Sequence, residues 1–185
     1  VGNSFSDPVG TCDDTALGTL RLLEAIRKQP HPPRFFHASS SQVFGRPHRE
    51  AQDESTPIAP VTPYGAAKAF ATTMVRISRD VHGLFAVNGI CYNHESPRRG
   101  PEFVTAKICR AVAAIRAGRE TLLKLGDMTA QRDWGDAREF VEGFWRSLRH
   151  PVADDYVFAT GRLHSVQHVV EMAFESAGQI GRAHV

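Results

Sequence analysis

The order of hydrophobic patterns along the chain is the feature that most constrains its fold. Short, mostly apolar segments typical of buried strands alternate with longer segments in which apolar residues recur at helical spacing. The predicted helices cover residues 13–28, 63–81, 102–117, 136–148 and 165–177, and the predicted strands cover 34–40, 84–91, 122–125 and 156–159. Such alternation indicates an α/β fold in which helices cover a parallel sheet.

The composition excludes several classes of protein. Of 185 residues, 42% are hydrophobic, enough for a packed core, and no run approaches the roughly 20 apolar residues that span a bilayer. The net charge of +2 gives no electrostatic argument for a nucleic-acid partner. The three cysteines form no CxxC pair, which indicates a reducing compartment and no zinc site. We expect all three to be small buried residues: Cys12, Cys91 and Cys109.

In a parallel sheet covered by helices, ligands bind outside the carboxyl ends of the strands. The chain carries three polar groups where this rule places a site: residues 38–45 at the end of one predicted strand, residues 93–100 after another, and residues 64–68 at the start of a helix. We therefore expect the chemistry of the protein to lie in these three segments.

Tyr64 and Lys68 lie four residues apart on a predicted helix and therefore share one of its faces. An ammonium beside a phenol favours the phenolate, which can take a proton from a sugar hydroxyl while a hydride leaves the same carbon. The hydroxyl of Ser40 could hydrogen-bond the same oxygen. The alternative is a surface pair without function, since this spacing also occurs by chance.

These residues, taken together, resemble those of the extended short-chain dehydrogenase/reductases that act on nucleotide sugars. Two further segments narrow the resemblance to the GDP-mannose 4,6-dehydratase family: NHESPRRG at residues 93–100 and RDWG at 132–135. The resemblance runs from about residue 4 to residue 178, nearly the whole chain.

The resemblance implies a reaction and a set of site residues. In that family NADP takes a hydride from C4 of GDP-mannose, water leaves across C5 and C6, and the hydride returns to C6. Tyr64 and Lys68 match the catalytic tyrosine and its lysine, which also holds the nicotinamide ribose, and Ser40 matches a catalytic threonine or serine. The cofactor-binding positions are His94 and Arg99, and the substrate-binding positions are Asn93, Lys107 and Arg132.

The substrate-binding positions also have ordinary alternatives. Asn93 could belong to a turn, Lys107 could lie on a solvated helix face, and Arg132 could pair with Asp133. Trp134 is expected to contribute packing.

The resemblance also implies a fold and its division. Residues 1–92 match the C-terminal part of an NADP-binding, doubly wound Rossmann-like domain, and residues 93–179 mix segments of that domain with part of a smaller substrate-binding domain. The family's first βαβ half, with its glycine-rich turn, has no counterpart here, so we expect a fragment that is inactive alone. Residues 180–185 match the translation of a common sequencing adapter, and we expect them to be foreign. The resemblance further implies a homo-oligomer, a dimer or tetramer, in the cytoplasm.

One departure from the family concerns the chemistry directly. Gln42 stands where the family has the glutamate that removes the C5 proton. An amide is not basic near neutral pH and cannot do this. Two alternatives therefore remain: an epimerase or reductase limited to redox chemistry at C4, and a non-catalytic homologue that binds a nucleotide sugar.

Overall fold

The computed structural model describes residues 2–46 and 51–178. It comprises two compact units, of which unit 1 is Val1–Tyr92 with Glu139–Phe158, and unit 2 is Asn93–Arg138 with Ala159–Val185. Each has its own sheet and its own apolar clusters, and each is described here by itself. The expected foreign tail, 180–185, lies outside the described residues.

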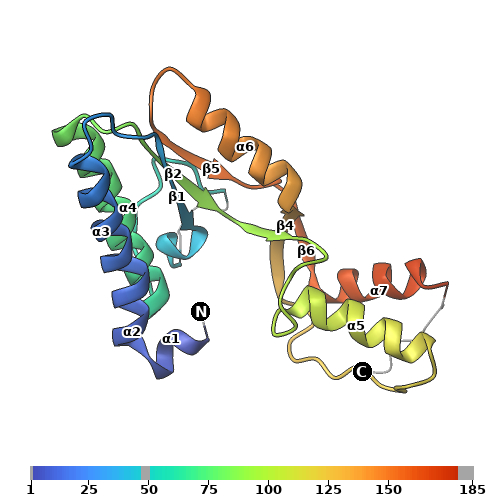
Figure 1. Cartoon of the computed structure of the whole chain (residues 1–185). Helices are drawn as coiled ribbons and strands as arrows, with labels where there is room; N and C mark the ends of the chain where they lie inside the picture. Colours follow the sequence, from blue (N-terminus) through green and yellow to red (C-terminus); the bar gives the residue numbers. More distant parts are fainter. Residues whose placement is uncertain (1, 47–50, 179–185) are drawn as a thin grey trace. The chain divides into compact units, whose positions relative to one another are not determined.

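Unit 1 is built on a parallel sheet in the order β1-β2-β5 (Figure 1). The middle strand is buried along its whole length, the pattern of a strand covered on both faces. This confirms the predicted parallel sheet and three of its strands, which the structure bounds as β1 Phe35–Ser40, β2 Ala86–Cys91 and β5 Asp155–Phe158.

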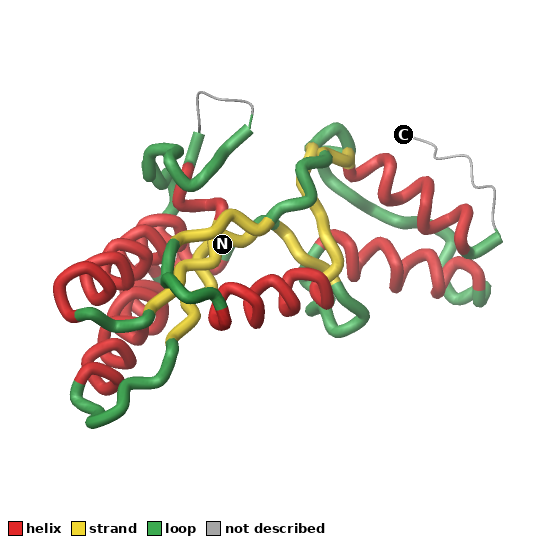
Figure 2. The backbone as a smooth tube through the Cα atoms, turned by 90° about the horizontal axis from the view of Figure 1, so that it is seen from above, coloured by secondary structure: helices red, strands yellow, loops and turns green. Residues whose placement is uncertain are grey.

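Helices cover both faces of this sheet (Figures 1 and 2). On one face α4 packs against β1 and β2, with α3 beside it. On the other face α6 packs Phe140 and Phe144 against Phe36 and Phe158. The segments of unit 1 are α1 Asn3–Ser6, α2 Pro8–Cys12, a π-helical turn Asp13–Leu17, α3 Gly18–Arg27, the 3₁₀ turn η2 Ser41–Phe44, α4 Pro63–His82 and α6 Ala137–Arg149.

The predicted helix at 63–81 forms as α4, and its ends follow from its sequence. Thr62 caps its first turn by accepting a hydrogen bond from the backbone N–H of Gly65, with Pro63 at the first helical position. Gly83 ends it in a left-handed conformation, φ 66°, which a residue without Cβ adopts at little cost.

Unit 2 contains a small mixed sheet beside a pair of helices. In this sheet β3 runs parallel to β4, and β4 runs antiparallel to β6. Helices α5 and α7 pack through Ile108, Val112, Val166 and Val170, which confirms both predicted helices. The elements are β3 Asn93–Glu95, α5 Val104–Arg116, β4 Gln131–Asp136, β6 Leu163–Ser165 and α7 Val166–Ser176.

The sequence expectations were wrong in three places. Residues 122–125 form no strand, because Leu123 and Leu125 are half-buried against the α5/α7 pair without strand pairing. The pattern missed β3, β4 and β6, which are short, largely polar segments joined through the backbone. Cys91 is buried as expected, but Cys12 and Cys109 are exposed. Among residues 2–46 and 51–178, no helix is long and apolar enough to cross a bilayer.

Candidate functional site

The first turns of α4 carry the two residues expected to do proton chemistry. Tyr64 and Lys68 are both half-buried, and Lys68 Nζ lies 5.8 Å from the centre of the Tyr64 ring. The same ammonium donates a hydrogen bond of 2.7 Å to the backbone carbonyl of Ala38 on β1. This contact joins the helix to the strand two residues before Ser40, so the structure brings Lys68 to the end of β1 where the sequence predicted a site.

Burial lowers the pKa of Lys68, because desolvation disfavours the ammonium. The electrostatic interaction of Lys68 with Cys91 opposes this shift. Cys91 lies opposite Ser40 in the register of β1 and β2. Burial raises the pKa of that thiol to about 12, so Cys91 stays protonated and takes no part in nucleophilic chemistry near neutral pH.

Ser40 ends β1 and caps the 3₁₀ turn that follows it. Its Oγ accepts a hydrogen bond of 3.2 Å from the backbone N–H of Gln42, which orients the hydroxyl at the strand end. The hydroxyl hydrogen is then available to a substrate oxygen, because the capping bond uses Ser40 as an acceptor.

Gly65 determines how closely the start of α4 approaches Gln42. A Cβ added at Gly65 would lie 2.7 Å from the backbone oxygen of Gln42, a contact that only glycine avoids. The backbone of Gln42 therefore lies close to the start of α4, so residues 38–45 and 64–68 lie near one another.

The sequence did not single out the loop before α4 as part of this arrangement. Glu54 Oε1 accepts a hydrogen bond of 2.8 Å from the backbone N–H of Val157 on β5, and Tyr92 donates one to the side chain of Gln52. The N–H of Ala59 donates one of 2.9 Å to the carbonyl of Val43. These contacts tie the loop to the carboxyl ends of β2 and β5 and to the 3₁₀ turn. A glutamate in a proline-rich polar loop gave no signal that would distinguish it.

In unit 2 the NHE residues of the family motif form β3, so Asn93 pairs with Trp134 and His94 with Gly135 in β4. The turn interpretation of Asn93 is wrong, since it is a strand residue. Trp134 is half-buried and packs against the α5/α7 cluster, as expected.

Arg99 is held on two sides within unit 2. Its Nε lies 3.2 Å from Glu95 Oε2, an ion pair whose angle is outside the range of a hydrogen bond, and its guanidinium lies 3.6 Å from the centre of the Phe103 ring. Glu95 also accepts a hydrogen bond of 2.6 Å from the hydroxyl of Thr105. Glu95 and Phe103 therefore orient a guanidinium that is still more than a quarter exposed.

Lys107 and Arg132 are both exposed, on α5 and β4. Arg132 donates to the carbonyl of Gln131, while the neighbouring Asp133 accepts hydrogen bonds from Thr160 and the N–H of Gly161. Asp133, the alternative partner expected for Arg132, therefore binds the turn at residues 160–161 instead. Lys107 lines a hollow of about 400 Å³ together with two other cations, Arg110 and Lys124, and with Glu120.

Comparisons with known proteins identify the family of the chain. A family model described as GDP-mannose 4,6 dehydratase matches residues 1–184. The chain is 49% identical to a GDP-mannose 4,6-dehydratase of Sinorhizobium fredii over 177 residues, which are 95% of this chain and 50% of that protein. It is 45% identical to the human GDP-mannose 4,6 dehydratase over 178 residues, again 95% of this chain and 48% of the relative.

A solved structure of RMD from Pseudomonas aeruginosa, complexed with NADPH, is also similar. It matches with a TM-score of 0.92 and 26% identity, over 97% of this chain and 63% of that one. The chain thus spans about half the length of the curated relatives that it matches. With a family model covering nearly every residue and a matching α/β fold, the chain belongs to the GDP-mannose 4,6-dehydratase family.

Proposed function

We propose that this chain supplies the proton-transfer centre of a GDP-mannose 4,6-dehydratase, which converts GDP-mannose into GDP-4-keto-6-deoxymannose and water. The observation that carries the proposal is the hydrogen bond from Lys68 to the carbonyl of Ala38, two residues before Ser40, with the Lys68 ammonium 5.8 Å from the centre of the Tyr64 ring. Family membership supports the substrate, since the named relatives are dehydratases of GDP-mannose.

The chemistry of the donors present fits a nicotinamide cofactor. One of the three N–H donors of the Lys68 ammonium is used by Ala38, and hydroxyls such as those of a ribose accept from such donors. Bound NADP would supply the hydride acceptor for C4 and the hydride donor for C6. His94 and Arg99 of unit 2 are the side chains proposed to hold it, Arg99 through a guanidinium suited to phosphate oxygens.

The residues of unit 1 then act on the C4 hydroxyl. The Tyr64 phenolate takes the O4 proton as the C4 hydride departs, so that the alcohol becomes a ketone. Ser40 donates a hydrogen bond to the same oxygen, and the Lys68 ammonium stabilises the phenolate by its charge. The C5 proton, made acidic by the ketone, must then be removed so that the C6 hydroxyl can leave as water.

The residues of unit 2 are proposed to hold the nucleotide sugar. Lys107 supports this role, because it lines a hollow with two further cations, and such a group attracts a diphosphate. Arg132 is exposed and offers donors, and Asn93 offers an amide. Each is proposed from its match to a family position.

Gln42 favours a second candidate function, because its amide cannot remove the C5 proton. An enzyme that stops at C4 redox chemistry fits this residue. The fold of this chain is also compatible with such an enzyme. A UDP-glucose 4-epimerase of Thermus thermophilus in complex with NAD matches this chain with a TM-score of 0.84 at 26% identity.

The experiment that separates these functions assays the complete gene product with GDP-mannose and NADP, with mass detection of the nucleotide sugar. A product lighter by one water supports the dehydratase, and cofactor reduction without water loss supports the C4-limited enzyme. Binding without either reaction indicates a non-catalytic homologue. Gln42→Glu should then increase water loss, with Gln42→Glu/Tyr64→Phe as the control in which no hydride transfer precedes it.

The finer attributes rest on the family resemblance and stay predictions. They are NADP rather than NAD, a homo-oligomer, the cytoplasm, and inactivity of the 185-residue chain alone. Turnover of GDP-mannose by the isolated chain would contradict the last of them.

A further inference from the structure

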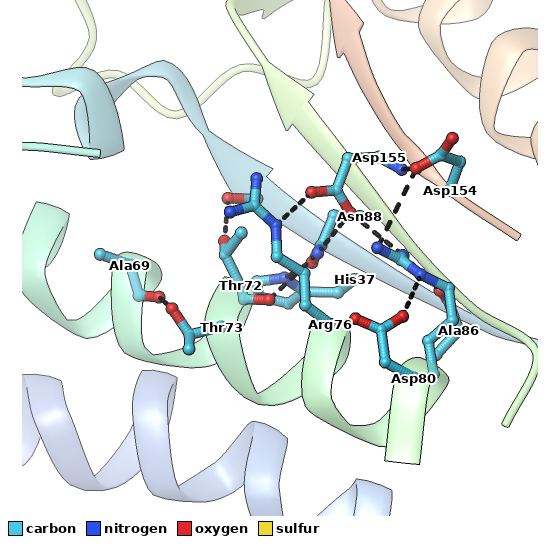
Figure 3. A network of polar contacts seen from close by, with 12 residues as sticks. His37, Ala69, Thr72, Thr73, Arg76, Asp80, Ala86, Asn88, Asp154 and Asp155 are labelled. Carbon is cyan, nitrogen blue, oxygen red and sulfur yellow. Dashed lines mark hydrogen bonds and ion pairs between the residues drawn. The ribbon is translucent and has the colours of Figure 1, made fainter. Parts of the chain in front are cut away.

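A row of buried polar residues crosses the sheet of unit 1 on the face that α4 covers. His37, Asn88 and Asp155 are register partners on β1, β2 and β5, and each is less than a tenth exposed. His37 Nδ1 lies 2.9 Å from Asn88 Oδ1, and Asn88 Nδ2 donates a hydrogen bond of 2.8 Å to Asp155 Oδ1 (Figure 3). We call these three residues the polar row.

The amide of Asn88 determines the protonation of its neighbours. Its Nδ2 donates both to Asp155 and, over 3.1 Å, to the backbone carbonyl of Thr72, so its Oδ1 is the acceptor. His37 must therefore carry its proton on Nδ1. Burial, with a smaller effect of the Lys68 charge, lowers the pKa of His37 to about 4, although the Asn88 hydrogen bond and the Asp155 charge oppose the shift. The row contains a neutral imidazole, a neutral amide and one carboxylate.

Helix α4 is attached to this row along its sheet-facing side. Thr72 provides the carbonyl that Asn88 binds (Figure 3). The hydroxyl of Thr72 lies 2.6 Å from that of Ser39. Arg76 forms an ion pair with Asp155, and Arg79 donates a hydrogen bond of 3.1 Å to the same carboxylate. Asn88 thus links all three strands and the helix through one side chain.

The attached residues continue the stripe of α4 that carries the proposed chemistry. Tyr64, Lys68, Thr72 and Arg76 are four residues apart in succession and therefore share one side of the helix. The hydrophobic effect is non-directional, whereas hydrogen bonds hold only near their preferred angles. The row therefore fixes the rotation and the axial position of α4.

We propose that Asn88 and His37 are positioning residues, which act through α4 and β1 to hold Lys68 and Tyr64 against the end of β1. The Ala38 carbonyl that binds Lys68 belongs to the residue after His37, so both ends of the Lys68 contact are anchored by the row. The chemical consequence rests on the proposed function, whereas the placement of Lys68 concerns this chain alone.

The placement is tested by the titration of Lys68, observed by NMR of lysine labelled with ¹³C at Cε and assigned with a Lys68→Arg variant. In the complete gene product, Asn88→Leu should release Lys68 to solvent and raise its pKa toward the ordinary lysine value. The matched control is Val87→Ala, the neighbouring residue on β2, equally buried but facing the other side of the sheet. An unchanged titration in a folded Asn88→Leu protein overturns the proposal.

A second pair of variants covers the case in which Asn88→Leu does not fold. His37→Gln keeps an N–H donor for the Asn88 oxygen, whereas His37→Leu removes it. We expect the Lys68 pKa to rise in His37→Leu and to stay at the wild-type value in His37→Gln. Equal behaviour of the two variants overturns the positioning role.

The catalytic consequence is read from the split between kcat and KM. With GDP-mannose and NADP, we expect Asn88→Leu to lower kcat for conversion of GDP-mannose by about tenfold or more, since small displacements of reacting groups are costly, with KM nearly unchanged. Val87→Ala should keep the wild-type kcat, and a kcat kept by Asn88→Leu as well contradicts the proposal. If the wild-type protein does not act on GDP-mannose, the proposed function fails, while the Lys68 titration still decides the role of the row.

Discussion

The two units hold their helices by different means. In unit 1, α4 lies on a row of buried polar side chains that joins three strands, and two arginines of the helix bind Asp155. In unit 2, α5 and α7 pack through aliphatic residues and leave a groove of about 870 Å³ beside them, lined by Val112, Val169, Met172 and Ala173 among others. Directional contacts thus join α4 to its sheet, whereas non-directional packing joins α5 to α7.

The polar contact that organises unit 2 lies in its sheet. Asp133 on β4 is buried and accepts hydrogen bonds from Thr160 and Gly161, which fixes the turn that leads into β6. No helix takes part in this contact. The polar contacts of unit 1 therefore constrain helix side chains, whereas the buried carboxylate of unit 2 constrains a turn of its sheet.

The largest expected difference between the units is catalytic. Lys68→Met in unit 1 should lower kcat for conversion of GDP-mannose by about a thousandfold, because it removes the cation beside Tyr64. Lys107→Met in unit 2 should raise KM for GDP-mannose and leave kcat nearly unchanged. Steady-state kinetics of the complete gene product measures both, and a kcat defect in Lys107→Met would break the division of roles.

The next largest effect concerns stability. Asp155→Ala should lower the free energy of unfolding by about 3 kcal/mol, because it leaves Arg76 and Arg79 facing the row without their carboxylate. Asp133→Ala should cost about 2 kcal/mol through its lost hydrogen bonds. Urea denaturation followed by circular dichroism gives both values. A larger loss in Asp133→Ala would reverse the comparison.

The pH dependence of unit 1 should follow His37, whose pKa of about 4 is depressed from 6.5 by burial. Because the pKa of His37 is lower in the folded protein, the unfolded chain binds this proton at a higher pH than the folded protein does. Its contribution to stability is complete above about pH 6.5 and falls as the pH drops toward 4, by roughly 2 kcal/mol at pH 5. Urea midpoints measured from pH 7 to 5 should show this loss in the wild type and a smaller one in His37→Gln. Equal losses would assign the effect to other groups.

The smallest effect is expected at the rim of the unit 2 groove. Met172 is half exposed there, so Met172→Ser should change the free energy of unfolding by less than about 0.5 kcal/mol. The neighbouring buried residue gives the contrast, since Val170→Ala should cost more than 1 kcal/mol. Thermal unfolding of both variants checks this, and a large loss in Met172→Ser would mean that the groove side contributes to the core.

Much of unit 1 could be predicted because its local signals agree. Thr62, Pro63 and Gly83 mark the ends of α4, and each strand of unit 1 contains a short apolar run. Unit 2 was predicted less well. Its strands β3, β4 and β6 carry polar residues, and an apolar segment with a strand pattern, 122–125, is used for packing.

By itself, the sequence determined the α/β class, the family motifs and the pairing of Tyr64 with Lys68, because spacing along a helix and the order of elements are local properties. Only the tertiary structure showed that Lys68 binds the Ala38 carbonyl and that the missing side chain of Gly65 lets the Gln42 backbone lie close to α4. It also showed that His37, Asn88 and Asp155 form one row. These residues lie tens of positions apart, and their partners are set by the register of neighbouring strands. The register results from the packing of the whole sheet, and no segment of the sequence contains it alone.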